Sequence, residues 1–432
     1  MRLAADLHLH SRYSRAVSPA MTLPAIARAA REAGMDLLST GDCLQPAWLA
    51  ELERGLVETA PGLFSPIPAV DAAANRDLPE SLRRPLRFVL GTEVHCAPPG
   101  TPELGGIHHL LYFPSFAAAR LMQRRLSSLG DLNEGRPRLR LDSRRLLQIV
   151  AEAGANCRFA PAHVWNPFFS AHGSQSGAAT PDALFGELAP RVTLAETGLT
   201  STPPMCRRFS GLDRCALFSS SDAHSLENVG REHTLVDLEP APTFDALFTA
   251  LGGSGVVQTV KFPIERTRYY RNRCLACALS FDASRCPRCG SVLIVGSRDR
   301  LELLADRREP RVPEHAPPFL MLLPLRDVLA EVCACGRDSA GVRQWHARLL
   351  REIGHERFIL TEAEPEAIAS AGTRDLARRI VAQRHTPPGR RTAAGLPPGS
   401  GLNQLDLFAA ANAVSPAQKP ATATLADEVD AE

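Results

Sequence analysis

Lysine is almost absent from this chain of 432 residues. It occurs only at Lys261 and Lys419, so arginine supplies 47 of the 49 basic residues. Arginine suits phosphate recognition because its planar guanidinium can bind two oxygens at once, although a bias toward GC-rich codons gives the same enrichment. The formal net charge of +2 is too small to indicate a partner.

Long apolar runs are also lacking. No run of about 18 apolar residues occurs, so no membrane span is predicted, and the start MRLAADLHLH has no apolar signal core. We therefore expect a cytoplasmic protein, by default a monomer. Its eleven cysteines are then reduced thiols or metal ligands and not a disulfide framework. Neither a P-loop nor a Ser–His–Asp nucleophile motif is present.

The length predicts two or three domains, and the apolar fraction of 44% predicts a buried core. Strand-like and helix-like patterns alternate over the first two-thirds, which predicts an α/β fold with a mainly parallel sheet or barrel. The expected strands are Leu3–His10, Asp36–Asp42, Arg87–His95, His108–Phe113, Arg158–Val164, Val192–Thr197 and Cys215–His224. The expected helices are Pro24–Gly34, Asp142–Gly154, Pro181–Leu188 and Thr243–Gly252.

Metal-ligand side chains fall at the ends of these predicted strands. Asp6, His8 and His10 alternate along the first strand, so they would point to one face. Five later strands also end in such residues: the second in Asp42, the third in Glu93 and His95, the fifth in His163, the sixth in Glu196 and the seventh in Asp222 and His224. The fourth strand is the exception, because it begins with His108 and His109. Functional groups of βα barrels gather at the carboxyl ends of strands. The set predicts a transition-metal site, although a single histidine pair could be incidental.

The phrases DLHLHS, STGDC, GTEVH, HHLLYF, PAHVWNPFFS, AETGLTS and SSSDAHS resemble the polymerase-and-histidinol-phosphatase (PHP) metal hydrolases. The longer phrases PAHVWNPFFS and ETGLTSTPPMCRRFSGLD are similar to endonuclease Q and its bacterial relatives. The resemblance covers most of residues 1–257. It implies a distorted seven-stranded βα barrel with two or three divalent metals (Zn, Mn or Mg) in its mouth.

The resemblance also implies a set of ligands. One metal would be held by His8, His10, Glu93 and Asp222. Glu93 would bridge to a second metal, held also by His163 and by His109 or His108. Asp42 and His224 would serve a third, although Ser14 and Arg15 stand where a histidine completes that site in other members. Glu196 is a further candidate ligand, the role of His95 stays open, and Asp222, Glu93 and His163 are expected to be essential for catalysis. Two bridged metals suit hydrolysis of phosphate esters.

Residues 258–300 contain two CxxC pairs, Cys274/Cys277 and Cys286/Cys289, eight residues apart. This spacing predicts a closed structural zinc site with four thiolates. Arginines and the pair Tyr269–Tyr270 make the segment basic and aromatic, which fits nucleic-acid contact or, equally, a solvated surface.

Residues 301–385 show helical apolar spacing at 319–332, 342–353, 364–370 and 373–383, which predicts a helical domain. Residues 386–432 are rich in Pro, Gly, Ala and Ser and are predicted to be a disordered tail. Inside the tail, Gln404-Leu405-Asp406-Leu407-Phe408 resembles the bacterial sliding-clamp binding motif. Gln404 would hydrogen-bond in the clamp pocket, and Leu405, Leu407 and Phe408 would fill its apolar part.

These features together predict a metal-dependent DNA repair endonuclease. The resemblance implies cleavage of the phosphodiester 5′ of deaminated bases (uracil, hypoxanthine, xanthine) or of abasic sites. The candidate DNA contacts are Arg207, Arg208, Trp165, Phe168, Tyr269 and Tyr270. The alternatives are a PHP phosphomonoesterase acting on a small molecule and an inactive module that binds DNA and the clamp.

Overall fold

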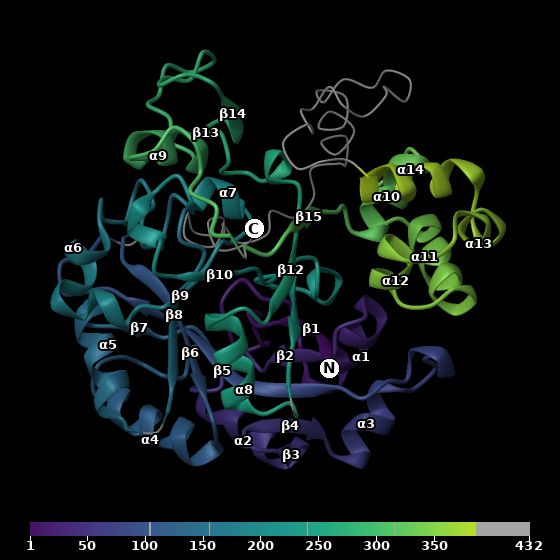
Figure 1. Cartoon of the computed structure of the whole chain (residues 1–432), viewed down its shortest axis with the longest axis horizontal. Coiled ribbons are helices and arrows are strands. Elements are labelled where there is room, and N and C mark those ends of the chain that lie inside the picture. Colours follow the sequence, from purple (N-terminus) through teal and green to yellow (C-terminus); the bar gives the residue numbers. More distant parts are fainter. Residues whose placement is uncertain (103–104, 155, 240, 315, 386–432) are drawn as a thin grey trace, which may run out of the picture.

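The computed structural model describes residues 1–102, 105–154, 156–239, 241–314 and 316–385 (Figure 1). The strands are β1 (Arg2–Asp6), β2 (Leu37–Ser39), β3 (Leu56–Ala60), β4 (Leu63–Pro66), β5 (Arg87–Cys96), β6 (Ile107–Phe113), β7 (Arg138–Leu139), β8 (Arg158–Pro161), β9 (Leu194–Glu196), β10 (Ala216–Phe218), β11 (His233–Asp237), β12 (Val256–Lys261), β13 (Asn272–Cys274), β14 (Leu279–Phe281) and β15 (Phe319–Met321). The α-helices are α1 (Leu23–Ala33), α2 (Pro46–Gly55), α3 (Pro68–Ala74), α4 (Phe116–Leu126), α5 (Ser143–Glu152), α6 (Pro181–Phe185), α7 (Pro203–Cys206), α8 (Phe244–Gly252), α9 (Ser297–Leu304), α10 (Leu325–Val332), α11 (Ala340–Glu352), α12 (Glu356–Thr361), α13 (Pro365–Ala371) and α14 (Arg374–His385).

The large sheet is mixed, not mainly parallel as the alternating pattern predicted. Its main path is β15-β12-β11-β1-β2-β5-β4-β3, with β6 and β7 attached to β5, and β8 to β6. The ladders β1–β2 and β2–β5 are parallel, but β6 runs antiparallel to both β5 and β8. The start of β6 therefore lies at the same edge as the end of β5, with His108 paired to His95.

All seven predicted strands are present, but most are shorter than predicted. β1 ends at Asp6, two residues before His8. The Asp6 carboxylate accepts hydrogen bonds from the backbone N–H of Ser221 (3.0 Å) and Gly230 (2.9 Å). β9 and β10 form a separate parallel pair. The hydrogen bonds from Val164 N to the Glu196 carbonyl (3.1 Å) and from His10 N to the Ala223 carbonyl (3.0 Å) link this pair to the strands on either side.

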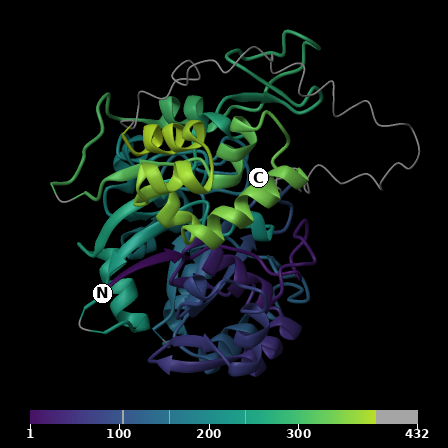
Figure 2. The same ribbon diagram turned by 90° about the vertical axis from the view of Figure 1, so that its right-hand side faces the viewer.

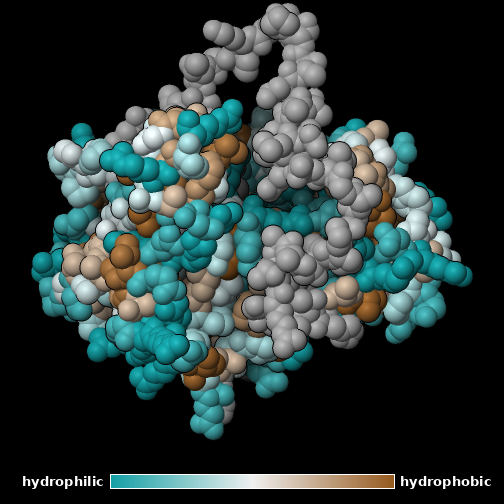
Figure 3. All heavy atoms as spheres, turned by 90° about the horizontal axis from the view of Figure 1, so that it is seen from above, coloured by the Kyte–Doolittle hydropathy of each residue, from teal (hydrophilic) through white to brown (hydrophobic). Residues whose placement is uncertain are grey.

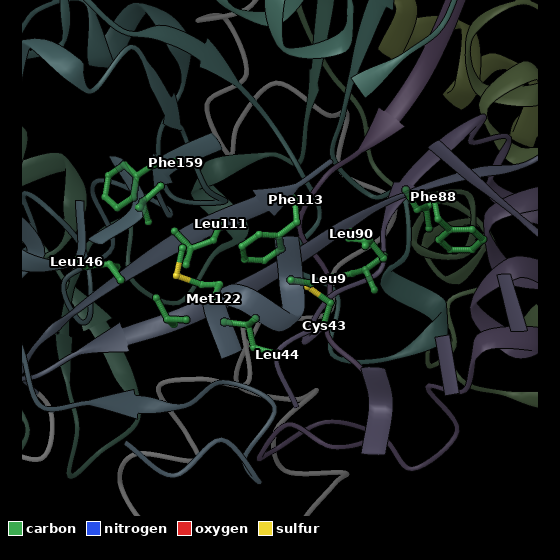
Figure 4. Packing of buried hydrophobic residues seen from close by; sticks show 14 of the residues in the cluster. Leu9, Cys43, Leu44, Phe88, Leu90, Leu111, Phe113, Met122, Leu146 and Phe159 are labelled. Atoms are coloured by element: carbon green, nitrogen blue, oxygen red, sulfur yellow. The ribbon is translucent and has the colours of Figure 1, made fainter. Parts of the chain in front are cut away.

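The predicted helices at α1, α5 and α8 match their expected ranges within two residues, whereas α6 ends at Phe185, before the predicted Leu188, and a 3-10 helix follows at Gly186–Arg191. α1 is followed by Gly34 in the left-handed region at φ 86°. The N-cap side chains of Asp142 and Thr243 accept hydrogen bonds from the first turns of α5 and α8. One core cluster lies between the sheet and helices that include α1, α4 and α5, and in it Leu44, Leu111, Phe113 and Met122 pack together (Figure 4).

The C-terminal part begins with a strand where the sequence predicted helical spacing, and it has an additional helix, α12. Residues 319–321 form strand β15, parallel to β12, and the helix begins only at Leu325, after Pro324. β12 itself crosses the expected boundary at residue 257. The helical unit α10–α14 and the segment β13–β14–α9 stand on opposite sides above the sheet, as two views show (Figures 1 and 2).

Seen from above, hydrophobic surface occurs in small patches among hydrophilic residues of the described part (Figure 3). Within the described ranges, no helix has both the length and the apolar character that a bilayer crossing requires. The clamp-like motif Gln404–Phe408 and the rest of the expected tail lie outside the described residues.

Candidate metal centre

The first cluster joins His8 and His10, which follow β1, to Asp222, which follows β10. The Oδ1 atom of Asp222 lies 3.4 Å from His8 Nε2 and 3.2 Å from His10 Nε2. One ligand atom from each residue lies within 4.8 Å of the other two. Asp222 has a left-handed φ of 48°, a strained conformation for a non-glycine residue that aims its side chain into the cluster. Asp6, which the strand pattern grouped with the histidines, instead ties two loops together.

The second cluster joins Glu93, His108 and His163. Glu93 Oε1 lies 3.0 Å from both His108 Nδ1 and His163 Nε2. Glu93 also faces the first cluster, since Oε1 is 3.6 Å from His8 Nε2 and Oε2 is 3.5 Å from His10 Nε2. Glu93 therefore lies between the two clusters, where the resemblance expected a bridging carboxylate.

The donor atoms of the two clusters suit divalent cations. Among the described residues, the buried atoms without a hydrogen-bond partner include His8 Nε2, His10 Nε2, Glu93 Oε2, Asp222 Oδ1 and both ring nitrogens of His108. A buried polar atom left unsatisfied costs about 1–3 kcal/mol, and imidazole with carboxylate is a ligand set for transition metals. The residues therefore fit the metals that the resemblance implies.

Electrostatics keep the carboxylates ionised. Burial alone would raise the pKa of Glu93, but the neighbouring imidazoles of His108 and His8 lower it well below its usual value. Burial likewise opposes ionisation of Asp222, but His8 and His224 hold its pKa far below the ordinary range. Both side chains are thus ready to bind a cation at neutral pH.

Two predicted ligands, Glu196 and Asp42, lie behind the histidines of the first cluster. Glu196 accepts hydrogen bonds from His8 Nδ1 (3.0 and 3.1 Å) and from the His163 backbone N–H (2.9 Å). Asp42 accepts from His10 Nδ1 at 3.0 Å and also from Ser11 and Ser14. These hydrogen bonds leave the Nε2 atoms of His8 and His10 facing the clusters, and neither carboxylate belongs to the two groups of clustered ligand atoms.

Three further histidines differ in position. His109 lies on the opposite face of β6, where its Nε2 is 2.8 Å from Ser143 Oγ and its ring packs against Phe159, so His108 and not His109 belongs to the cluster. The alternation of side chains along a strand explains this outcome. His224 lies beside His10, with ring centroids 4.7 Å apart. His95 Nε2 donates to the Gly105 carbonyl at 2.9 Å, and burial lowers its pKa to about 4.

Most of the expected DNA-contact residues serve the packing of the protein itself. Trp165, Phe168 and Tyr269 are buried, so their rings are not available to stack on a base, and that expectation is corrected. The Arg207 guanidinium donates to the carbonyls of Leu212 (2.7 Å) and Cys215 (2.9 Å). Arg208 forms an ion pair with Glu302, and Tyr270 is half-buried.

The four cysteines of the CxxC pairs lie together beside the β13–β14 hairpin. The sulfur atoms of Cys274 and Cys289 are 3.6 Å apart, those of Cys277 and Cys286 are 3.9 Å apart, and all four lie within 4.8 Å of one another. We refer to residues 269–297 as the cysteine module.

The cysteine module reaches the metal centre through aromatic rings. Tyr269 contacts Phe168 edge-on, with ring centroids 5.5 Å apart. Phe169, which follows Phe168 in the chain, stacks on His108 with ring centroids 4.8 Å apart and an interplanar angle of 7°. The Phe169 carbonyl also accepts a hydrogen bond from the His108 backbone N–H at 2.7 Å. This chain of contacts supports one side of the second cluster.

Sequence patterns missed two buried cationic groups. Arg136 Nη1 lies 3.6 Å from Glu93 Oε2, and only 6% of its side chain is exposed. Lys261 forms a fully buried ion pair with Glu232 and also donates to Thr197 Oγ1 (3.0 Å). Arg136 lies in a segment without a recognised motif, and one arginine among so many carries no signal. The scarcity of lysine could have marked Lys261.

Sequence comparisons find two uncharacterised relatives of this chain. No family model matches the chain. The uncharacterised protein YqxK of Bacillus subtilis is 27% identical over 399 residues, which is 89% of this chain and 95% of the relative. The uncharacterised protein MJ0043 of Methanocaldococcus jannaschii is 27% identical over 164 residues, 38% of this chain and 16% of its own length.

Two solved structures are similar over nearly the whole described chain. The lesion-specific endonuclease PfuEndoQ from Pyrococcus furiosus has a TM-score of 0.75 and 28% identity, covering 89% of this chain and 91% of that one. Endonuclease Q in complex with a 27-mer duplex substrate, with an abasic lesion at the active site, has a TM-score of 0.77 and 28% identity, covering 89% and 92%.

The fold and the paired clusters define a mixed α/β protein with a candidate centre for divalent metals. Its structural neighbours are endonuclease Q proteins, so the resemblance predicted from the sequence motifs is confirmed.

Proposed function

We propose that this chain is a metal-dependent DNA repair endonuclease that hydrolyses the phosphodiester 5′ of a deaminated base or an abasic site. The endonuclease Q neighbours indicate a hydrolase that cleaves DNA. The observation that carries the proposal is the position of Glu93 between two histidine clusters, in a chain that matches endonuclease Q over 89% of its length. Uracil, hypoxanthine and xanthine enter only through the motif resemblance.

Each residue of the centre has a role that follows from its contacts. Glu196 and Asp42 hold the Nδ1–H groups of His8 and His10, which fixes the tautomer whose Nε2 atoms can bind a cation. The Asp222 side chain is 19% exposed, against 1% for Glu93, so substrate approaches from the Asp222 side. Bound divalent cations supply Lewis acidity and offset the charge of a phosphodiester.

We also propose the finer architecture that the sequence predicted. The seven strands would form a distorted barrel at 1–257, followed by a zinc-binding module (258–300), a helical domain (301–385) and a tail (386–432). The sulfur distances in the cysteine module support one structural zinc ion, since four thiolates within 4.8 Å match a closed tetrahedral site. The contacts between strands β8, β9, β10 and β1 support the barrel.

Recruitment by the bacterial sliding clamp through Gln404, Leu405, Leu407 and Phe408 is a further proposal, and the pentapeptide alone supports it. Deletion of residues 404–408 should abolish clamp binding and leave the incision of short duplexes unchanged. Equal clamp affinity with and without the pentapeptide would contradict it. We propose that the protein acts in the cytoplasm as a monomer.

The variant Asp222→Ala tests the metal centre. It removes the carboxylate shared by His8 and His10, so incision of a lesion-containing duplex should be lost while duplex binding persists. Asp237→Ala is the matched control, because Asp237 is an exposed carboxylate paired with Arg2. Retained incision by Asp222→Ala would refute the metal assignment. Phosphate release from small monoesters, without any incision by the unaltered protein, would favour a phosphomonoesterase.

A further inference from the structure

The histidines of the two clusters differ in what holds their rings. In the first cluster, the ring nitrogens His8 Nδ1 and His10 Nδ1 each face a buried carboxylate at 3.0 Å. In the second cluster, His108 faces Glu93 through Nδ1 at 3.0 Å, and its other nitrogen, Nε2, is buried without a hydrogen-bond partner among the described residues. The second ring nitrogen of a metal-binding histidine ordinarily makes a hydrogen bond that fixes the ring. Another contact must therefore set the plane of the His108 imidazole.

An aromatic face lies directly against that imidazole. The ring of Phe169 is stacked on His108, with centroids 4.8 Å apart and 7° between the ring planes. In a close-packed interior, a ring in parallel contact cannot rotate about its Cβ–Cγ bond without moving into its neighbour. Because the lone pair of an imidazole nitrogen lies in the ring plane, the stack fixes the direction in which Nδ1 can bind a cation.

The backbone of Phe169 is strained in this position. Its φ of 56° lies in the left-handed region, a conformation that persists in a non-glycine residue only where the surroundings determine it. The Phe169 carbonyl accepts a hydrogen bond from the His108 backbone N–H at 2.7 Å, and the N–H of the next residue, Ser170, donates to Ser176 Oγ at 3.0 Å. The loop after β8 therefore holds His108 both by its backbone and by its ring.

The ring of His95 braces this pair. Its centroid lies 5.0 Å from that of His108 and 5.1 Å from that of Phe169, with interplanar angles of 62° and 55°. The hydrogen bond from His95 Nε2 to the Gly105 carbonyl keeps the His95 ring in place. All three rings are buried, so the orientation of His108 depends on packing.

We propose that Phe169 is a positioning residue that sets the plane of the His108 imidazole and, through it, the affinity of the second cluster for its divalent cation. Phe169 takes the place that carboxylates have behind His8 and His10. The inference rests on the proposed function in one respect, that the second cluster binds a metal, and it does not depend on the substrate.

The test titrates the full-length protein with Mn²⁺ and follows the free ion by its electron paramagnetic resonance signal. Thiolate sites select softer metals, so Mn²⁺ does not report on the cysteine module. Phe169→Leu removes the stacked ring. Phe159→Leu is the matched control, because Phe159 is also buried and its ring centroid lies 4.8 Å from that of His109, the neighbouring histidine on the opposite face of β6.

Phe169→Leu should bind one of its Mn²⁺ ions roughly tenfold more weakly, as expected when the group that orients a metal-binding histidine is lost. Phe159→Leu should bind Mn²⁺ like the unaltered protein, although both variants should unfold at a lower temperature because each leaves a cavity. Phe169→Tyr keeps the aromatic face and should restore the affinity. Unchanged affinity in Phe169→Leu, equal weakening in Phe159→Leu, or no recovery in Phe169→Tyr would overturn the proposal and make Phe169 a packing residue.

The two proposals can fail separately. If the unaltered protein incises duplexes and Phe169→Leu binds Mn²⁺ equally well, the inference is wrong and the endonuclease function stands. If the unaltered protein incises nothing, but Phe169→Leu still weakens one Mn²⁺ site, the endonuclease function is wrong and the positioning role stands. If the unaltered protein binds no divalent cation outside the cysteine module, both proposals are wrong.

Discussion

Replacing Glu196 with glutamine separates the ligands of the metal centre from the residues that orient them. The Glu196 carboxylate is fully buried and contacts His8 Nδ1 at 3.0 and 3.1 Å and the His163 N–H at 2.9 Å. Glutamine has nearly the same shape and keeps one acceptor oxygen. It loses the negative charge, and its NH₂ group meets the His8 Nδ1–H, where an acceptor is required.

The size of the effect follows from these contacts. A hydrogen bond to a charged group contributes about 1.5–3 kcal/mol, against about 0.5–1.5 kcal/mol for a neutral pair. Loss of the charge should therefore weaken the orientation of His8 by about 1–2 kcal/mol. This agrees with the tenfold to 100-fold loss of metal affinity that is typical when a group behind a metal-binding histidine is changed.

A chelator-competition titration measures this loss directly. Glu196→Gln should bind the same number of metal ions as the unaltered protein, each more weakly by roughly tenfold to 100-fold at the first cluster. Glu187→Gln, which changes an exposed carboxylate paired with Arg144, is the control. Loss of a whole metal equivalent would mean that Glu196 is a direct ligand, as the sequence first suggested. Unchanged affinity would mean that it does not orient His8.

Three other predictions concern stability and the zinc content. Lys261→Met leaves the Glu232 carboxylate buried without its partner, so the free energy of unfolding should fall by about 3–5 kcal/mol. Adding Glu232→Gln should restore much of this loss. An equal loss in the single and the double variant would mean that lost packing, and not the unpaired charge, causes it. Burial lowers the pKa of His172 and of His233 to about 4, below the unfolded value near 6.5. Each histidine therefore contributes about 3 kcal/mol of stability above pH 6.5, and this contribution is lost as the pH falls toward 4. When both are replaced by glutamine, the free energy of unfolding of the metal-free protein should fall less steeply with decreasing pH. An identical pH profile would refute this. Cys289→Ser should lower the bound zinc by one equivalent in mass spectrometry of the metal content, and unchanged zinc would contradict the four-thiolate site.

The sequence predicted which side chains would meet where ligand-type residues follow strand ends, and metal binding by them stays a prediction. His8, His10, Glu93, His163 and Asp222 were predicted from their position after strands, and the structure brings them together. The direction of β6 could not be predicted from alternation alone, because βα units imply parallel neighbours. Its antiparallel pairing with β5 explains how a histidine at the start of a strand reaches residues at the ends of others.

The remaining differences have local causes. Residue type does not distinguish a ligand from a carboxylate one layer behind it, so the sequence could not predict that Glu196 and Asp42 face the Nδ1 atoms of His8 and His10. The choice between His108 and His109 depends on the register of one strand, since a shift by one residue exchanges its two faces.

Incision of a labelled duplex is the measurement that decides most directly whether this protein is a lesion-directed endonuclease. The duplex would carry a single deoxyuridine, deoxyinosine or abasic site and would be tested with manganese, magnesium and zinc against an undamaged duplex. We predict a single cut 5′ of the lesion, abolished by EDTA and by Asp222→Ala. No cut under any of these metals, together with metal-dependent release of phosphate from small monoesters, would contradict the proposed function.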